Sequence, residues 1–215
     1  MCFLTLQAAV AGLRMWTGAV NTNWSTPGNW AASTLPGPFD DVIIPAITPP
    51  NKYPNLTNDV AVNSVLIQGA IRLNDYRLIT SGQITVYATG HLGLTGTAAQ
   101  KHLFSSGKII LRLGSTVTYM SISSGPVWDG PYENLSVINR DKLEGDSAFT
   151  VNKAFTVKSG STTLKSNITI GEKFENNGTF TSASGKTVTF NGTTSIEGTG
   201  IFNFDNLTVS SGTLT

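Results

Sequence analysis

The sequence predicts an all-β protein, built as a right-handed parallel β-helix (β-solenoid) with a tryptophan-rich capping segment near its N-terminus. Three observations predict this fold: short alternating strands recur at a regular interval, two strand sequences return at a longer offset, and the composition favours strands and tight turns. Gly supplies 22 of the 215 residues. Ser, Thr and Asn are abundant between short apolar runs, which suits strands joined by turns, because Thr is β-branched while Gly and Asn tolerate positive φ.

The regular interval is clearest in the second half of the chain. Strands with an apolar-x-apolar pattern begin at Phe155, Ile168, Val188 and Leu207, and the steps from Ile168 to Val188 and from Val188 to Leu207 are nearly equal. Short strands that recur about every 20 residues between Gly, Ser and Asn turns indicate one solenoid coil per interval. Each coil then buries one apolar row and stacks its strand about 4.8 Å from the next.

Two strand sequences return after a longer interval. Ser115–Tyr119 (STVTY) resembles Lys186–Phe190 (KTVTF), and Glu133–Val137 (ENLSV) resembles Asp205–Val209 (DNLTV). Both matches have nearly the same offset, of about 70 residues, which predicts a tandem array. A β-sandwich is the alternative fold, but it gives no reason for near-identical strands at one fixed offset and therefore ranks second.

The chain divides into an apolar N-terminal segment (1–15), a Trp- and Pro-rich entry unit (16–58) and solenoid repeats (59–215). The first segment has two interpretations. It is the remnant of an export signal, because Ala9-Val10-Ala11 suits a signal peptidase although a basic region is missing, or it is a first strand that interacts with a neighbour. It is too short to span a membrane. Charged residues make up 13% of the chain and the net charge is +1, so no nucleic-acid surface is expected.

Three of the four tryptophans, Trp16, Trp24 and Trp30, fall close together in the sequence among Pro and Gly residues. The cluster has two interpretations. Because a solenoid end exposes apolar core and unpaired strand edges, the three indoles are expected to cap the first coil. Alternatively, exposed indoles would stack on sugar rings and bind a surface glycan. The cap is the favoured interpretation.

Threonines occupy the middle of the regular strands, at Thr156, Thr169, Thr189 and Thr208, and Thr187 lies on the same face as Thr189. The pattern predicts an outward column of hydroxyl groups. An ordinary solvent-facing strand surface explains it, because Thr favours strands. The alternative is a ligand-binding ladder at Thr169, Thr187, Thr189 and Thr208 that orders water on ice or contacts a glycan.

No catalytic pattern is found, and the chain is not expected to be an enzyme. His91 and His102 have no Cys or Asp at triad or metal-ligand spacing. Asp141, Glu144 and Asp146, beside Arg140, are expected in a solvated loop. No cofactor is predicted except a structural Ca²⁺, for which Asp40 and Asp41 would supply oxygen ligands. The alternative is that both residues belong to the turn before the strand Val42-Ile43-Ile44.

The segment from Trp16-Thr-Gly through Asn29-Trp30 to Asp40-Asp41-Val-Ile-Ile-Pro45 resembles the entry segment of large secreted repeat proteins of Bacteroidetes-type bacteria, and Gly198–Thr215 is similar to their repeats. The resemblance covers about a third of the chain. It implies a non-catalytic structural or adhesive protein of the bacterial cell surface, extracellular, that self-associates into a fibre or continues into a larger polypeptide. The alternatives are a glycan- or ice-binding module and, less favoured, a β-helical polysaccharide lyase or hydrolase.

Overall fold

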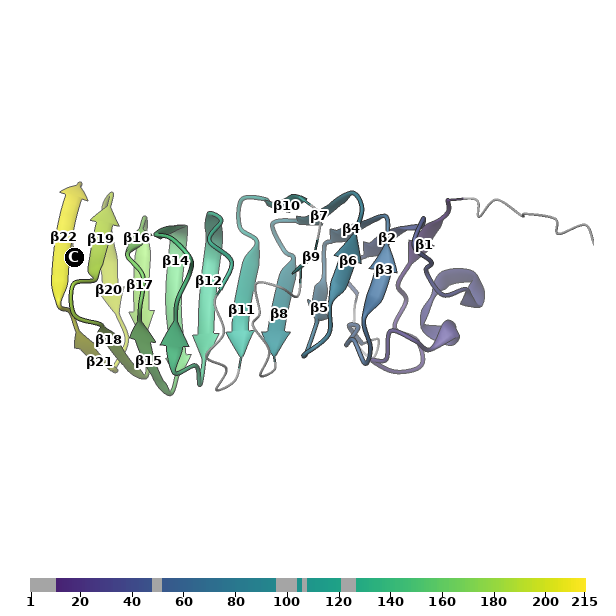
Figure 1. Ribbon diagram of the computed structural model, residues 1–215, viewed down its shortest axis with the longest axis horizontal. Helices are drawn as coiled ribbons and strands as arrows, with labels where there is room; N and C mark the ends of the chain where they lie inside the picture. Colours follow the sequence, from purple (N-terminus) through teal and green to yellow (C-terminus); the bar gives the residue numbers. More distant parts are fainter. Residues whose placement is uncertain (1–10, 48–51, 96–103, 106–107, 121–126) are drawn as a thin grey trace, which may run out of the picture.

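A computed structural model shows a parallel β-solenoid of about seven turns, which confirms the predicted fold class (Figure 1). The structure describes residues 11–47, 52–95, 104–105, 108–120 and 127–215. Within these ranges every pairing between strands is parallel. A β-sandwich is built from antiparallel sheets, so this alternative is wrong.

The strands form four sheets, each running from coil to coil along the solenoid. The N-terminal sheet contains β1 (Leu13–Met15), β2 (Asp41–Ile44), β4 (Ser64–Ile67), β7 (Gln83–Val86) and β10 (Lys108–Leu111). The long sheet contains β5 (Ala70–Arg72), β8 (His91–Thr95), β11 (Thr116–Met120), β12 (Tyr132–Ile138), β14 (Phe149–Ser159), β16 (Ile168–Ile170), β17 (Lys173–Asn176), β19 (Thr187–Asn191), β20 (Ser195–Glu197) and β22 (Asn206–Ser211). The two smaller sheets contain β3 (Val60–Val62), β6 (Leu78–Thr80) and β9 (Phe104–Ser105), and β13 (Lys142–Leu143), β15 (Ser161–Leu164), β18 (Thr179–Ser182) and β21 (Ile201–Asn203). Two short 3₁₀ helices, η1 (Pro27–Asn29) and η2 (Ala31–Ser33), lie in the entry unit.

The coil interval agrees with the sequence pattern. Ile168 pairs with Val188 and Val188 with Leu207, so the strands that the pattern places one interval apart are direct neighbours in the stack. At the N-terminus the interval is longer, from Leu13 to Asp41, because the tryptophan loop lies between these paired strands. β1 and β2 are already solenoid strands, and the entry unit is therefore part of the stack.

The long sheet buries two parallel rows of apolar side chains. β14 spans both, since its residues 149–151 pair with β16 and its residues 154–157 pair with β17. In the next coil Gly171 lies in the turn between β16 and β17, where β14 continues as a single strand. A Cβ at this position would lie 2.0 Å from the Asn152 carbonyl oxygen, so a side chain does not fit there. The first core row contains Val117, Leu135, Phe155, Phe174 and Ile196, and the second core row contains Phe149, Ile168, Val188 and Leu207.

The structure confirms a repeated architecture of stacked coils, but the longer offset does not return to the same position on the coil. Ser115–Tyr119 and Glu133–Val137 overlap β11 and β12, which pair side by side in the first core row. Lys186–Phe190 and Asp205–Val209 overlap β19 and β22, which pair in the second core row. Two pairs of stacked strands with similar sequences therefore occur in the chain, and they lie at different positions on the coil.

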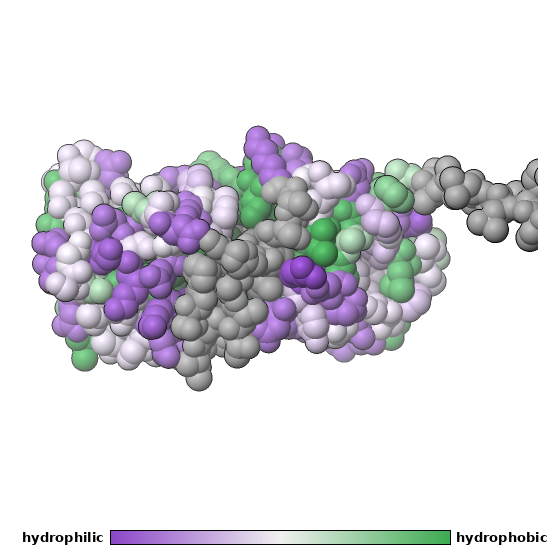
Figure 2. Space-filling model, in the orientation of Figure 1, coloured by the Kyte–Doolittle hydropathy of each residue, from purple (hydrophilic) through white to green (hydrophobic). Residues whose placement is uncertain are grey.

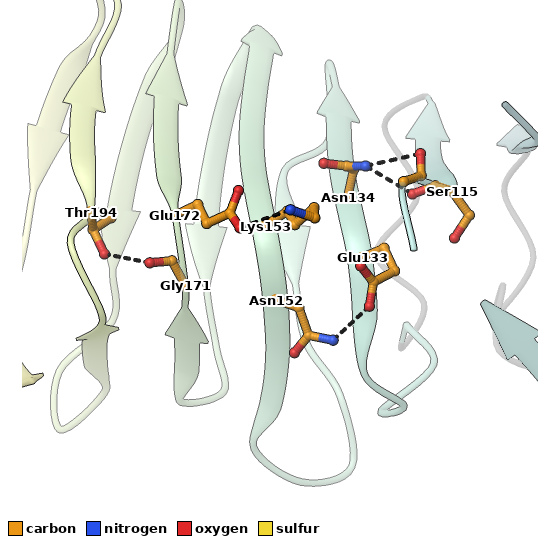
Figure 3. A network of polar contacts seen from close by, with 9 residues as sticks. Ser115, Glu133, Asn134, Asn152, Lys153, Gly171, Glu172 and Thr194 are labelled. Carbon is orange, nitrogen blue, oxygen red and sulfur yellow. Dashed lines mark hydrogen bonds and ion pairs between the residues drawn. The ribbon is translucent and has the colours of Figure 1, made fainter. Parts of the chain in front are cut away.

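Polar side chains join the coils at the corner between the two rows (Figure 3). Asn152 Nδ2 donates a hydrogen bond of 2.8 Å to Glu133 Oε1, and Lys153 Nζ forms an ion pair of 2.8 Å with Glu172 Oε1. Exposed ion pairs of this kind stabilise the fold by about 0–1 kcal/mol. These contacts therefore mainly fix the direction of the side chains at the corner. Two more contacts cross the coils here, Asn134 Nδ2 to Ser115 O and Thr194 Oγ1 to Gly171 O.

Candidate functional site

The tryptophan cluster forms a packed cap. Trp16, Trp24 and Trp30 are 0%, 3% and 2% exposed, and the Trp30 ring meets the other two edge to face, at centroid distances of 5.1 and 4.6 Å. Trp16 Nε1 donates to the Lys52 carbonyl oxygen and Trp30 Nε1 to that of Trp24, both at 2.7 Å. Because the indoles are buried and their N–H groups are bonded, they offer no platform to a sugar ring, and their prediction as a ligand site is wrong.

Among the described residues, a partly buried ion pair is the first member of the inward row of the N-terminal sheet. Arg14 pairs in register with Val42, which is 1% exposed, so an arginine stands where the following coils have Val or Ile. Arg14 Nε donates to Asp40 Oδ2 at 3.0 Å, and the N–H groups of Gly12 and Gly37 donate to the same carboxylate at 2.8 Å. A charge that points inward at a sheet edge opposes the addition of another strand.

The same contacts involve Asp40 and Asp41, for which a structural Ca²⁺ stays a prediction. The Asp40 carboxylate is occupied by three N–H donors, and Asp41 Oδ1 accepts hydrogen bonds from Asn63 Nδ2 and Ser64 Oγ. Asp40 therefore ties the turn before β2 to its neighbours, and Asp41 ties the start of β2 to the start of β4. Within the described ranges, no three His, Cys, Asp or Glu residues gather closely enough to hold a metal ion.

Acid is expected to weaken the N-terminal end through Asp40. Burial alone would raise the pKa of its carboxyl, but hydrogen bonds from Gly37, Arg14 and Gly12 and the charge of Arg14 outweigh burial and lower this pKa below its ordinary value of 3.8. A lowered folded-state pKa gives stability that is present above the unfolded value and is lost as pH falls through the folded value. Urea unfolding across this range should show the free energy of unfolding falling below pH 4 in the wild type. The fall should be smaller in Asp40→Asn; an equal fall in both proteins would contradict the role of this carboxylate.

The threonine column exists, but one member differs from the prediction. Thr169 pairs with Thr189 and Thr189 with Thr208, as expected, whereas the strand before them contributes Thr150. Thr156 lies in the other row, between Ser136 and Glu175, because β14 continues around the corner. Thr187 pairs with Asn206, and its backbone N–H donates to Asn167 Oδ1 at 2.9 Å. A ligand for this column stays a prediction.

Lys173 and His91 make polar contacts between neighbouring coils. Lys173 Nζ lies 3.0 Å from Glu175 Oε2 and 3.6 Å from Glu197 Oε2, which joins β17 to β20. His91 Nε2 is 2.7 Å from Thr118 Oγ1, and burial together with the positive charges of Lys158 and Arg72 lowers the pKa of its imidazole. His102 lies outside the described residues.

Arg140 does not lie in a solvated loop, contrary to the prediction. Its side chain is 0% exposed, and its guanidinium carbon lies 5.1 Å from the centroid of the Tyr119 ring. Its neighbours Asp141, Glu144 and Asp146 are exposed, as predicted. The sequence pattern places the loop correctly but misses a cation–π contact made across coils.

The C-terminal end of the solenoid is open. β22 pairs with β19 on one side, and each of its residues is exposed. Leu207 and Val209 continue the inward positions of Val188 and Phe190, yet they are 43% and 44% exposed, whereas Val188 and Phe190 are 0% exposed. This free edge, with apolar side chains in core positions, is the candidate functional surface (left end of Figure 1).

The described residues define a parallel β-solenoid in which the outer edge of β22 is unpaired. Comparisons with models of protein families, with curated proteins and with solved structures find no match to this chain. No helix in the described ranges has the length and apolarity needed to cross a membrane.

Proposed function

We propose that this chain is a non-catalytic structural or adhesive solenoid of a bacterial cell surface, and that its open C-terminal end stacks on another β-coil. The extracellular location rests on the resemblance of Trp16–Pro45 to the entry segments of secreted repeat proteins. The observation that carries the proposal is the unpaired edge of β22, where Leu207 and Val209 are exposed in core positions.

At the C-terminal end, strand edge and apolar surface occur together. Full burial of a Val or Leu side chain stabilises a protein by about 1.5–3 kcal/mol. Leu207 and Val209 are only partly buried, so they gain only part of this stabilisation. A further coil would pair with the free edge of β22 and cover these side chains at the same time, as happens between every pair of internal coils.

The N-terminal end opposes the same contact. Another coil stacked on β1 would cover the Arg14–Asp40 ion pair and take Arg14, which is still 26% exposed, further out of water. Removing charges from water is costly unless new partners replace the solvent. A head-to-tail fibre needs both ends, so the proposal places the contact at β22. Two copies that meet there form a closed dimer, and in a longer polypeptide the next coil occupies the same place.

Light scattering during gel filtration tests the proposal over a wide range of protein concentration. The wild type is expected to shift from monomer to dimer as concentration rises. Leu207→Lys and Val209→Lys should remain monomeric, because each places a charge in a core position. Thr208→Lys is the matched control, because it adds the same charge to the outward face of the same strand and should behave as the wild type. A wild type that is monomeric at every concentration would contradict self-association at this end.

A further inference from the structure

Among the described residues, β10 is the last strand of the N-terminal sheet, and a notch lies beside it. Ile109 and Leu111 pair with Ile84 and Val86, which are 1% and 0% exposed, yet both are only half-buried because no strand in the described ranges follows β10. A cavity of about 410 Å³ lies here, between β10, the loop at Trp128–Pro131 and the corner of β12 and β14. This volume lies within the range of small-molecule sites. Figure 2 shows apolar surface beside hydrophilic surface along the upper edge of the molecule, where Figure 1 places β10.

Trp128 forms one wall of the notch and is the one tryptophan of the chain that is partly exposed. Two buried tyrosines fix its backbone: the Trp128 N–H donates to Tyr119 Oη at 3.1 Å, and Tyr132 Oη donates to the Trp128 carbonyl oxygen. The two hydroxyls are 3.0 Å apart, and since the Tyr132 proton is used, Tyr119 donates to Tyr132. The Tyr132 ring also meets the Trp128 indole edge to face, at 5.4 Å. The indole is therefore held in place before any ligand arrives.

A carboxylate with spare acceptor capacity also lines the cavity. Glu133 Oε1 accepts the hydrogen bond from Asn152 Nδ2, whereas Glu133 Oε2 is buried and accepts none from the described residues. A buried carboxylate oxygen without a donor is costly, so this atom favours a ligand that brings a hydroxyl group. Asn152 keeps its side-chain oxygen as a further acceptor.

The rim of the notch carries positive charge. Lys108 and Arg112 both line the cavity and are exposed, Lys108 at the start of β10 and Arg112 directly after its end. With Glu133, the three ionised side chains give the lining a net charge of +1 (two cations and one anion). The lining therefore offers a rigid indole, aliphatic side chains, a hydroxyl acceptor and cations to one ligand.

We propose that this notch binds one or two units of an acidic saccharide. The apolar face of a sugar ring would lie against Trp128 and the isoleucines of β10, a ring hydroxyl would donate to Glu133 Oε2, and a carboxylate of the saccharide would pair with Lys108 or Arg112. The site lies in the middle of the solenoid and does not depend on β22, so it stands independently of the proposed stacking at the C-terminal end.

Isothermal titration calorimetry of the full chain tests the site. The ligands are tetramers of glucuronic, mannuronic and galacturonic acid and the matching neutral tetramers of glucose, mannose and galactose. At least one acidic tetramer is expected to bind, more tightly than its neutral counterpart and more weakly as salt is added. No heat with any of the six ligands, or equal affinity for an acidic tetramer and its neutral match, would overturn the proposal.

Variants assign the binding to the notch. Trp128→Ala and Glu133→Gln are each expected to weaken the binding of the acidic tetramer about tenfold. Lys108→Gln should weaken it while leaving the fold intact, because this side chain is exposed. Lys142→Gln, an exposed lysine on β13 away from the notch, is the matched control and should bind as the wild type. If Lys108→Gln and Lys142→Gln weaken binding equally, the notch is not the site. A dimer lost in Leu207→Lys with saccharide binding retained separates this proposal from the previous one.

Discussion

Replacing Phe174 by Ala is expected to lower the free energy of unfolding by about 3–5 kcal/mol, because it leaves a cavity in the middle of a stack of aromatic rings. Phe174 is 0% exposed. Its ring stacks on Phe155 at 5.0 Å and meets Phe180 and Phe202 edge to face at 4.8 and 5.2 Å. Phe180 belongs to the same coil as Phe174, whereas Phe155 and Phe202 belong to the coils before and after it, so no single coil can close the cavity by itself.

Urea unfolding followed by circular dichroism measures this effect. Phe39→Ala is the control, because Phe39 is 59% exposed and its loss should change stability by less than about 0.5 kcal/mol. Since a solenoid is held together by contacts between neighbouring coils, the C-terminal coils are expected to unfold first in Phe174→Ala. A loss no larger than that of Phe39→Ala would contradict the aromatic core described above.

Trp30→Ala is expected to cost a similar amount, about 3–5 kcal/mol, because Trp30 is the centre of the N-terminal cap. The substitution removes two ring contacts, with Trp16 and Trp24, and the hydrogen bond from Trp30 Nε1 to the Trp24 carbonyl oxygen. It also exposes the first coil to water. The emission of the remaining tryptophans should then shift to longer wavelength.

Thermal and urea unfolding of Trp30→Ala and Trp30→Phe measure the role of the cap. Trp30→Phe keeps most of the apolar volume and should recover part of the loss, although the hydrogen bond is gone. If Trp30→Ala were as stable as the wild type, the cluster would not be a structural cap.

The fold class could be predicted from the sequence because it depends on a periodic pattern. The interval of about 20 residues and the apolar-x-apolar strands at Ile168, Val188 and Leu207 are properties of single strands, and the structure confirms them. The cap could be predicted as well, since three tryptophans near the first coil need a place to be buried.

The arrangement of strands around the coil could not be predicted in the same way. Thr156 and Thr169 have the same local pattern, yet they lie in different rows because β14 passes the corner as one strand whereas the next coil divides into β16 and β17. The long repeat was misinterpreted for the same reason. Strands with similar sequences pair with similar neighbouring strands in the stack, but they do not need to lie at the same position on the coil.

The sequence pattern also does not predict the burial of Arg140 or the position of Trp128 beside the notch. Arg140 stands in a hydrophilic stretch, and only contacts across coils bury it against Tyr119. Trp128 belongs to the loop Trp128-Asp-Gly-Pro131, next to the edge of β10, and it did not enter the sequence-based interpretation. A single aromatic residue between turn residues, where the coil interval leads one to expect a strand, is the signal that could have found the notch.

The central claim is that a further β-coil stacks on the open C-terminal end, and amide hydrogen exchange of β22 tests it most directly. The Asn206 N–H donates to the Lys186 carbonyl oxygen, so alternation along the strand directs the N–H groups of Leu207 and Val209 to the free edge. These two amides are expected to exchange slowly at high protein concentration and rapidly on dilution, while the Asn206 amide changes little. Rapid exchange of the Leu207 and Val209 amides at every concentration would contradict the claim.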